Sequence, residues 1–226
     1  MIIRRLLNTY GGSFSKELGI TLEGRDPKEL FKWFLASILY GARISASIAK
    51  RTYWMIEREA NTPRRIIETG WDRLVEILDE GGYTRYDFKT ARKLIEMAEN
   101  LEKKFRGDLN VIHDQASSPR ELENQLKGLA KGIGNVTVNI FLRELRGIWP
   151  KADPPPRNII VNAAANLGLI EVKSKDLEHY KSILDSLRKI WKESRVYGYT
   201  FSDFEATLLR YGLSMKRKNR HLIMSN

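Results

Sequence analysis

The chain contains no cysteine. This absence excludes disulfide bonds, catalysis by a thiolate, and zinc or iron–sulfur sites that are built on cysteine ligands. Histidine is scarce too, and the spacing of His113, His179 and His221 matches no pattern of metal ligands. The neighbouring His113 and Asp114 are too little for a catalytic or metal site on their own. We therefore expect a protein without a metal centre or redox cluster.

Long apolar runs are missing as well. No stretch approaches the roughly 20 apolar residues that a membrane-spanning helix needs. The N-terminal residues 1–13 are too short and too often interrupted to resemble a signal peptide. We expect a cytoplasmic protein with no membrane partner, associated with the nucleoid if its source is prokaryotic.

Strand-like alternation of apolar and polar residues is also absent. Short apolar runs such as 111–112 and 159–161 do not demand a sheet. Apolar residues recur instead at helical spacing, and Asp26-Pro27, Thr62-Pro63 and Ser118-Pro119 each place a capping residue before a helix-initiating proline. The sequence predicts an all-α protein. Helices are expected at the N-terminus, over about 28–40, 45–59, 63–78 with a restart at Gly70, 88–105, 119–129, after Gly134, over 157–165 and 174–194, and from 200 onward, with loops over 81–87 and 107–118.

Positive charge is abundant. The 226 residues include 39 basic and 28 acidic ones, so the formal net charge is +11. This balance favours a polyanionic partner that contributes phosphate contacts. Many basic soluble proteins bind no nucleic acid, so charge alone leaves the question open. The basic stretch 216–221 fits either a contact with a DNA backbone or a disordered, solubilising tail.

The stretch Leu129–Asp153 holds the most informative pattern. Gly132-Ile133-Gly134 forms a tight apolar turn, and a helix follows with apolar residues at helical spacing. A glycine turn that opens a helix leaves the first N–H groups unpaired, and these groups with the helix dipole favour an anion. The stretch ends on the carboxylate of Asp153, which three prolines follow.

These residues resemble the helix-hairpin-helix DNA glycosylases (the HhH-GPD superfamily of endonuclease III). The family pattern is Leu-Pro-Gly-hydrophobic-Gly, variable residues, Thr-Ala-Asn, and then a catalytic Asp further on. Ala130 and Lys131 stand where the pattern has a proline. The loop 81–87 with its following helix and the segment 166–169 also resemble the family, so the likeness covers about 31–169. The matching positions are Leu129, Gly132, Ile133, Gly134, Thr137, Asn139 and Asp153.

The resemblance implies a two-lobed all-α glycosylase fold. Residues 27–147 would form a helical barrel lobe that ends in the helix-hairpin-helix at about 119–147. Residues 1–26 and 148–226 would form the second lobe, with Asp153 at the cleft. Many relatives carry an iron–sulfur cluster near the C-terminus, which a chain without cysteine cannot build. Hairpin carbonyls in the family can hold a monovalent cation.

The resemblance also implies an activity, which is hydrolysis of the bond between a flipped damaged or mispaired base and deoxyribose. Asp153 would be the catalytic carboxylate that stabilises the oxocarbenium-like transition state. Its other reading is a cap for a helix or turn beginning at Pro154. Relatives that also nick the strand use a lysine where this chain has Val136, so we expect a monofunctional enzyme unless Lys151 substitutes.

The expected DNA contacts fall into three groups. The hairpin would hold phosphate through Lys131, Gly132, Ile133, Gly134, Asn135, Val136 and Thr137. In the loop 40–43, Arg43 or Tyr40 would be the wedge that fills the space left by the flipped base, although Tyr40 could equally be core and Arg43 solvated. Candidate aromatics for the base pocket are Tyr40, Trp33 and Tyr83, with Trp54 as a further one.

The expected partner is double-stranded DNA with a damaged or mismatched base, bound by a monomer. The sequence does not identify the base. Two other readings stay open: a helix-hairpin-helix protein that binds duplex DNA without catalysis, and a helical protein–protein adaptor. The adaptor leaves the positive charge and the glycine turn unexplained.

Overall fold

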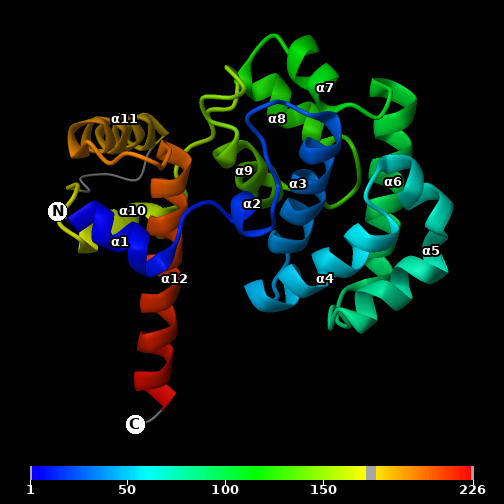
Figure 1. Ribbon diagram of the computed structural model, residues 1–226, viewed down its shortest axis with the longest axis horizontal. Coiled ribbons are helices and arrows are strands. Elements are labelled where there is room, and N and C mark those ends of the chain that lie inside the picture. The colour runs from blue at the N-terminus through cyan, green and yellow to red at the C-terminus, as the bar shows by residue number, and fades with distance from the viewer. Residues whose placement is uncertain (1, 172–176, 225–226) are drawn as a thin grey trace. The chain divides into compact units, whose positions relative to one another are not determined.

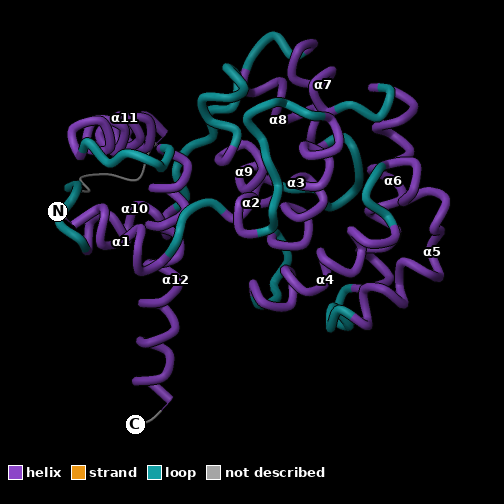
Figure 2. Tube along the Cα trace, viewed as in Figure 1, coloured by secondary structure: helices purple, strands orange, loops and turns teal. Residues whose placement is uncertain are grey.

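The computed structural model describes residues 2–171 and 177–224, with side chains over 2–171 and 180–217. Within these residues the secondary structure is helical and contains no strand, which confirms the all-α prediction (Figures 1 and 2). The described helices include none that is long and apolar enough to cross a membrane. Their bounds are α1 Ile2–Tyr10, α2 Phe14–Glu17, α3 Pro27–Tyr40, α4 Ala46–Glu59, α5 Pro63–Glu80, α6 Asp87–Phe105, α7 Leu109–Gln115, α8 Pro119–Lys127, α9 Asn135–Glu144, α10 Asn158–Asn166, α11 Leu177–Ser194 and α12 Phe201–Met224.

The predicted helix starts are confirmed by their caps. The side chains of Asp26, Thr62 and Ser118 each accept a hydrogen bond from a first-turn N–H, and each precedes a proline in the first turn. Gly70 interrupts α5 with φ 73° and ψ 173°, where the sequence predicted a restart. Local chemistry therefore fixed these boundaries.

The prediction of a loop over 107–118 is wrong, because this segment contains α7. The Asp108 side chain accepts a hydrogen bond from the N–H of Asn110, and Leu109 and Ile112 are buried. A helix of seven residues is too short to show a clear periodicity, so only the cap could have indicated it.

Contacts divide the chain into two compact units. The central unit is Leu18–Asp153, and the terminal unit joins Met1–Glu17 to Pro154–Asn226. The lobes expected from the sequence were 27–147 and the remainder. Asp153 is therefore the last residue of the central unit.

Helix α3 lies in the core of the central unit, packed against α4, α7 and α9 (Figure 1). Trp33 is fully buried, and its indole N–H donates to the carbonyl oxygen of Phe141 over 3.1 Å. The rings of Phe34 and Phe141 meet edge to face, with centroids 4.9 Å apart. These contacts fix α9 against α3, and α5 packs against α6 in the same unit.

Helix α12 organises the terminal unit and packs against α1, α10 and α11 (Figure 1). Gly212 permits a close approach of α10, since a Cβ at this position would lie 2.8 Å from Ile159 Cγ1. The helix continues through the basic stretch 216–221. Lys216 and Arg217 are exposed, and the side chains from 218 onward lie outside the described residues.

Candidate nucleic-acid interface

The segment Gly128–Gly134, called the glycine turn below, joins α8 to α9 in the central unit. Gly132 has φ +90°, a conformation that L side chains rarely adopt. The buried Ile133 donates its N–H to the carbonyl of Ala130 over 3.1 Å. Apolar residues thus anchor the turn, while its exposed positions are Gly128, Lys131, Gly132 and Gly134.

The N-terminus of α9 is uncapped by any side chain. Gly134 occupies the cap position and has no side chain to offer. In the described part of the chain, the backbone N–H groups of Gly134, Asn135 and Val136 form no hydrogen bond. All three residues are exposed. These donors and the helix dipole favour an anion at this end of α9.

The expected wedge loop lies beside this helix terminus. A Cβ at Gly41, which follows α3, would lie 2.5 Å from Thr137 Oγ1, so only glycine fits there without displacement. Thr137 is itself buried against this contact. Arg43 is exposed, and Tyr40 is partly buried. The fold therefore brings the loop 40–43 and the first turn of α9 together.

Helix α6 supports the glycine turn through a row of polar residues that sequence reasoning missed. Asn100 Nδ2 donates to the carbonyl of Leu129 over 3.0 Å. Glu96 Oε1 accepts the N–H of Lys131 over 3.2 Å. One turn earlier on the same helix face, the Lys93 side chain lies over Gly132. Polar residues at this spacing usually face solvent, so the sequence alone held no signal for this role.

Asp153 is partly exposed and forms an ion pair. Its side chain is 38% exposed, and its Oδ1 lies 2.5 Å from Nη1 of Arg146, whose side chain is only 4% exposed. Sequence reasoning did not single out Arg146. The suggestion that Asp153 caps a helix is wrong, because α10 begins at Asn158 with Arg157 at its cap position.

Helix α7 holds the segment that leads to Asp153. Trp149 stacks on the buried His113 with ring centroids 4.8 Å apart, and its indole N–H donates to Asn110 Oδ1 over 3.3 Å. Lys151 Nζ donates to the carbonyl of His113 over 2.7 Å. The ammonium of Lys151 is thus bound to the backbone of α7.

Two of the aromatics expected at a base pocket are core residues. Trp33 is 0% exposed and Tyr83 is 1% exposed, so neither ring offers a face on which a base could stack in this structure. Burial raises the pKa of Tyr83, whose hydroxyl lies 3.4 Å from that of Thr90. Tyr40 remains partly accessible.

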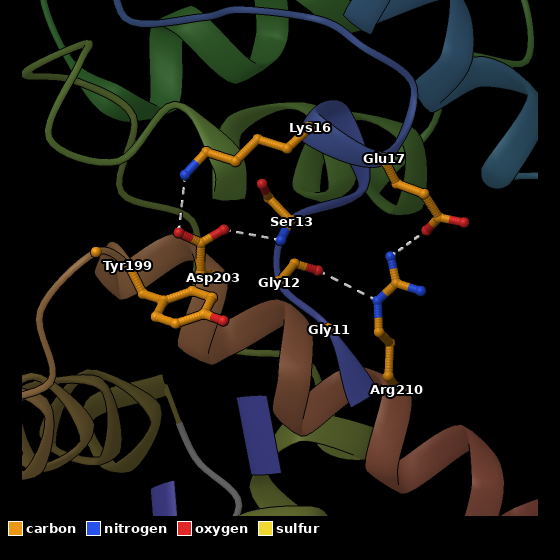
Figure 3. Close-up of a pocket in the computed structure, with 9 residues that line it drawn as sticks. Gly11, Gly12, Ser13, Lys16, Glu17, Tyr199, Asp203 and Arg210 are labelled. Atoms are coloured by element: carbon orange, nitrogen blue, oxygen red, sulfur yellow. Dashed lines mark hydrogen bonds and ion pairs between the residues drawn. The ribbon is translucent and has the colours of Figure 1, made fainter. Parts of the chain in front are cut away.

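A second candidate site is a pocket of about 420 Å³ in the terminal unit (Figure 3). Asp203, at the start of α12, is fully buried on its wall and accepts hydrogen bonds from the Ser13 N–H and from Lys16 Nζ. Asp203 and Thr200 also cap α12 reciprocally, since each accepts the other's N–H. The pocket is lined by Gly11, Gly12, Ser13, Lys16, Glu17, Gly198, Tyr199, Asp203 and Arg210.

The charges around this pocket compensate each other. Burial raises the pKa of Asp203, but the N–H groups of Ser13 and Thr200, together with Lys16, outweigh it and lower the pKa to about 2. Arg210 pairs with Glu17 and donates to the carbonyl of Gly12 (Figure 3). These bonds fasten the segment 11–17 to α12, which is a structural task.

The described residues contain no group of three or more His, Asp or Glu side chains that could hold a metal ion. No protein-family model matches the chain, and no curated protein sequence matches it.

Proposed function

We propose that this chain is a DNA glycosylase of the helix-hairpin-helix type, with two helical lobes, which hydrolyses the N-glycosidic bond of a flipped damaged or mispaired base. The observation that carries the proposal is the meeting of two separate segments. The glycine turn at residues 128–134 leads directly into α9, and the loop 40–43 meets the first turn of α9 where Gly41 approaches Thr137. A glycosylase must bind the DNA backbone and insert a wedge residue into the base stack at the same site.

In the proposed complex, the exposed N–H groups of Gly134, Asn135 and Val136 bind a phosphate oxygen, and Lys131 adds an ionic contact. These contacts position the protein without reading the sequence. Arg43, which is exposed on the neighbouring loop, enters the base stack. Unstacking a base costs roughly a few kcal/mol, which the phosphate contacts help to offset.

Asp153 is the proposed catalytic residue. Its carboxylate stabilises positive charge on the sugar as the bond to the base breaks, and it orients the water that attacks the same carbon. The buried guanidinium of Arg146 holds this carboxylate in one orientation. Val136 cannot form a Schiff base, and Lys151 is bound to the carbonyl of His113, so the proposed enzyme leaves an abasic site and does not cut the strand.

The ion pair of Asp153 also favours a second candidate function. A carboxylate that already faces Arg146 has part of its charge compensated, and this suits a duplex-binding protein without catalysis. The glycine turn would then bind duplex DNA, and the protein would catalyse no reaction on it.

A panel of duplexes with single modified bases tests the glycosylase. Duplexes that hold uracil, hypoxanthine, an alkylpurine or an oxidised guanine are incubated with excess protein, and base release is followed as alkali-labile strand breaks. We expect release from at least one duplex by the wild type and loss of about 100-fold or more in rate in Asp153→Asn. Asp72→Asn, at an exposed site in the same unit, is the matched control and should retain the rate.

Duplex binding without release from any substrate would contradict the glycosylase and support the second candidate. Borohydride trapping of a covalent protein–DNA adduct would overturn the monofunctional assignment.

A further inference from the structure

Lys93 is a cation in an unusual position on α6. Its side chain lies across the glycine turn, and a Cβ at Gly132 would be 3.1 Å from Lys93 Cε and 3.5 Å from Nζ. A Cβ here would press on the end of the Lys93 side chain, and the φ of +90° at Gly132 also favours glycine. Gly132 and Lys131 are exposed beside it, while Lys93 itself is partly buried.

The ammonium of Lys93 has no counter-ion. Among the described residues, no carboxylate lies within 4.0 Å of it and no hydrogen bond involves it, although the helix neighbour Glu96 is close in sequence. Glu96 instead accepts the backbone N–H of Lys131. Burial lowers the pKa of Lys93, because removing water disfavours its charged form.

Removing water from a cation costs free energy, and an anion bound next to the cation offsets this cost. The ammonium of Lys93 lies beside the exposed backbone of Gly132, and the exposed Lys131 precedes Gly132 in the chain, so a phosphate oxygen at this backbone would meet Lys93 directly. Asn100 and Glu96 hold Leu129 and Lys131, which lie just before Gly132 in the turn.

We propose that Lys93 binds a backbone phosphate of duplex DNA beside Gly132, so that α6 and the glycine turn bind the DNA together. This inference rests on the proposed function, because it takes the turn to be the DNA-binding element. Glu96 and Asn100 then act as positioning residues that hold the turn in the shape that leaves Gly132 open.

The experiment compares full-length variants in their affinity for an undamaged duplex over a range of salt concentrations. Lys93→Met keeps the length of the apolar stem and removes the charge, Lys93→Arg keeps a charge, and Lys104→Met is the control. Lys104 is exposed on the same helix, about 16 Å further along its axis. Thermal unfolding of each variant verifies folding, and we expect Lys93→Met to be at least as stable as the wild type.

Each lost phosphate contact lowers the slope of log affinity against log salt by about 0.9. We therefore expect Lys93→Met to reduce this slope by about 0.9, which corresponds to one phosphate contact, and to weaken binding roughly five- to tenfold at 0.1 M salt. Lys93→Arg should retain most of the slope, and Lys104→Met all of it. Inorganic phosphate at constant ionic strength should not displace the duplex, which distinguishes a backbone phosphate from a free one.

A wild-type slope in Lys93→Met, with normal duplex binding, would overturn the role of Lys93 and leave the proposed function standing. Displacement by inorganic phosphate would make the site a free-phosphate site and also overturn the inference. Absence of salt-dependent duplex binding in the wild type would overturn the proposed function itself, and the role of Lys93 with it.

Discussion

Replacing Asp203 with asparagine should destabilise the terminal unit by an amount that the structure allows us to work out. The pKa of this buried carboxyl is lowered from 3.8 to about 2 by the donors around it. At 1.36 kcal/mol for each pKa unit, this difference corresponds to about 2 kcal/mol of stability above pH 4. An asparagine keeps one acceptor but turns an N–H group toward the donors of Ser13, Lys16 or Thr200.

The assay is thermal unfolding followed by circular dichroism between about pH 2 and pH 7. A loss of about 2 kcal/mol lowers the Tm of a chain of this size by roughly 4–8 °C at pH 7. Because the folded-state pKa is depressed, the contribution is present above the ordinary pKa and is lost as the pH falls toward 2. The gap between wild type and Asp203→Asn should thus shrink below about pH 4 and nearly close at pH 2.

The matched control is Asp185→Asn, which removes an exposed carboxylate paired with Arg188 and should leave the Tm unchanged. A variant at position 203 with the wild-type Tm at pH 7, or a gap that stays constant down to pH 2, would refute the reasoning.

Two further predictions concern the candidate interface. Gly41→Ala should cost about 1–3 kcal/mol of stability and weaken duplex binding, because the new Cβ meets Thr137 Oγ1 at 2.5 Å and displaces the first turn of α9. Gly24→Ala, at a site with open space, should have little effect on either measurement, and equal behaviour of the two variants would contradict the packing argument. Arg146→Met should slow base release about tenfold or more with little change in duplex affinity, because it frees the Asp153 side chain to move; Arg146→Lys should recover part of the rate, and an unchanged rate in Arg146→Met would deny Arg146 a positioning role.

Local signals made most of the helical framework predictable. Asp26, Thr62 and Ser118 mark helix starts because each side chain bonds to N–H groups within three residues, an interaction that the sequence displays directly. The kink at Gly70 could be predicted for a different reason, since glycine readily adopts the positive φ found there. Helix α7 could not, since its seven residues provide too few apolar positions for a period to appear.

The candidate site was predictable only in part. Gly132 and Gly134 stand out by their spacing, and the turn that they form is the one in the structure. Lys93 and Arg146 could not be identified, because their importance comes from packing against segments far away in the sequence. The same holds for Asp203, whose hydrogen bond to the N–H of Ser13 spans 190 residues.

The buried state of Trp33 and Tyr83 shows a related limit of sequence reasoning. The sequence alone does not distinguish an aromatic ring that lines a pocket from one that is buried in the core. Only the packing of α3 against α9 distinguishes the two for Trp33, whose indole bonds to the backbone of Phe141.

The most direct test of the account measures the affinity of the wild type and of Gly134→Glu for an undamaged duplex at several salt concentrations. The account predicts salt-dependent binding by the wild type with a slope of several phosphate contacts, at about 0.9 for each. In Gly134→Glu, a carboxylate at the uncapped start of α9 should repel the phosphate and weaken binding to all duplexes alike. Equal affinities of the two proteins at every salt concentration would contradict the claim that this turn holds the DNA backbone.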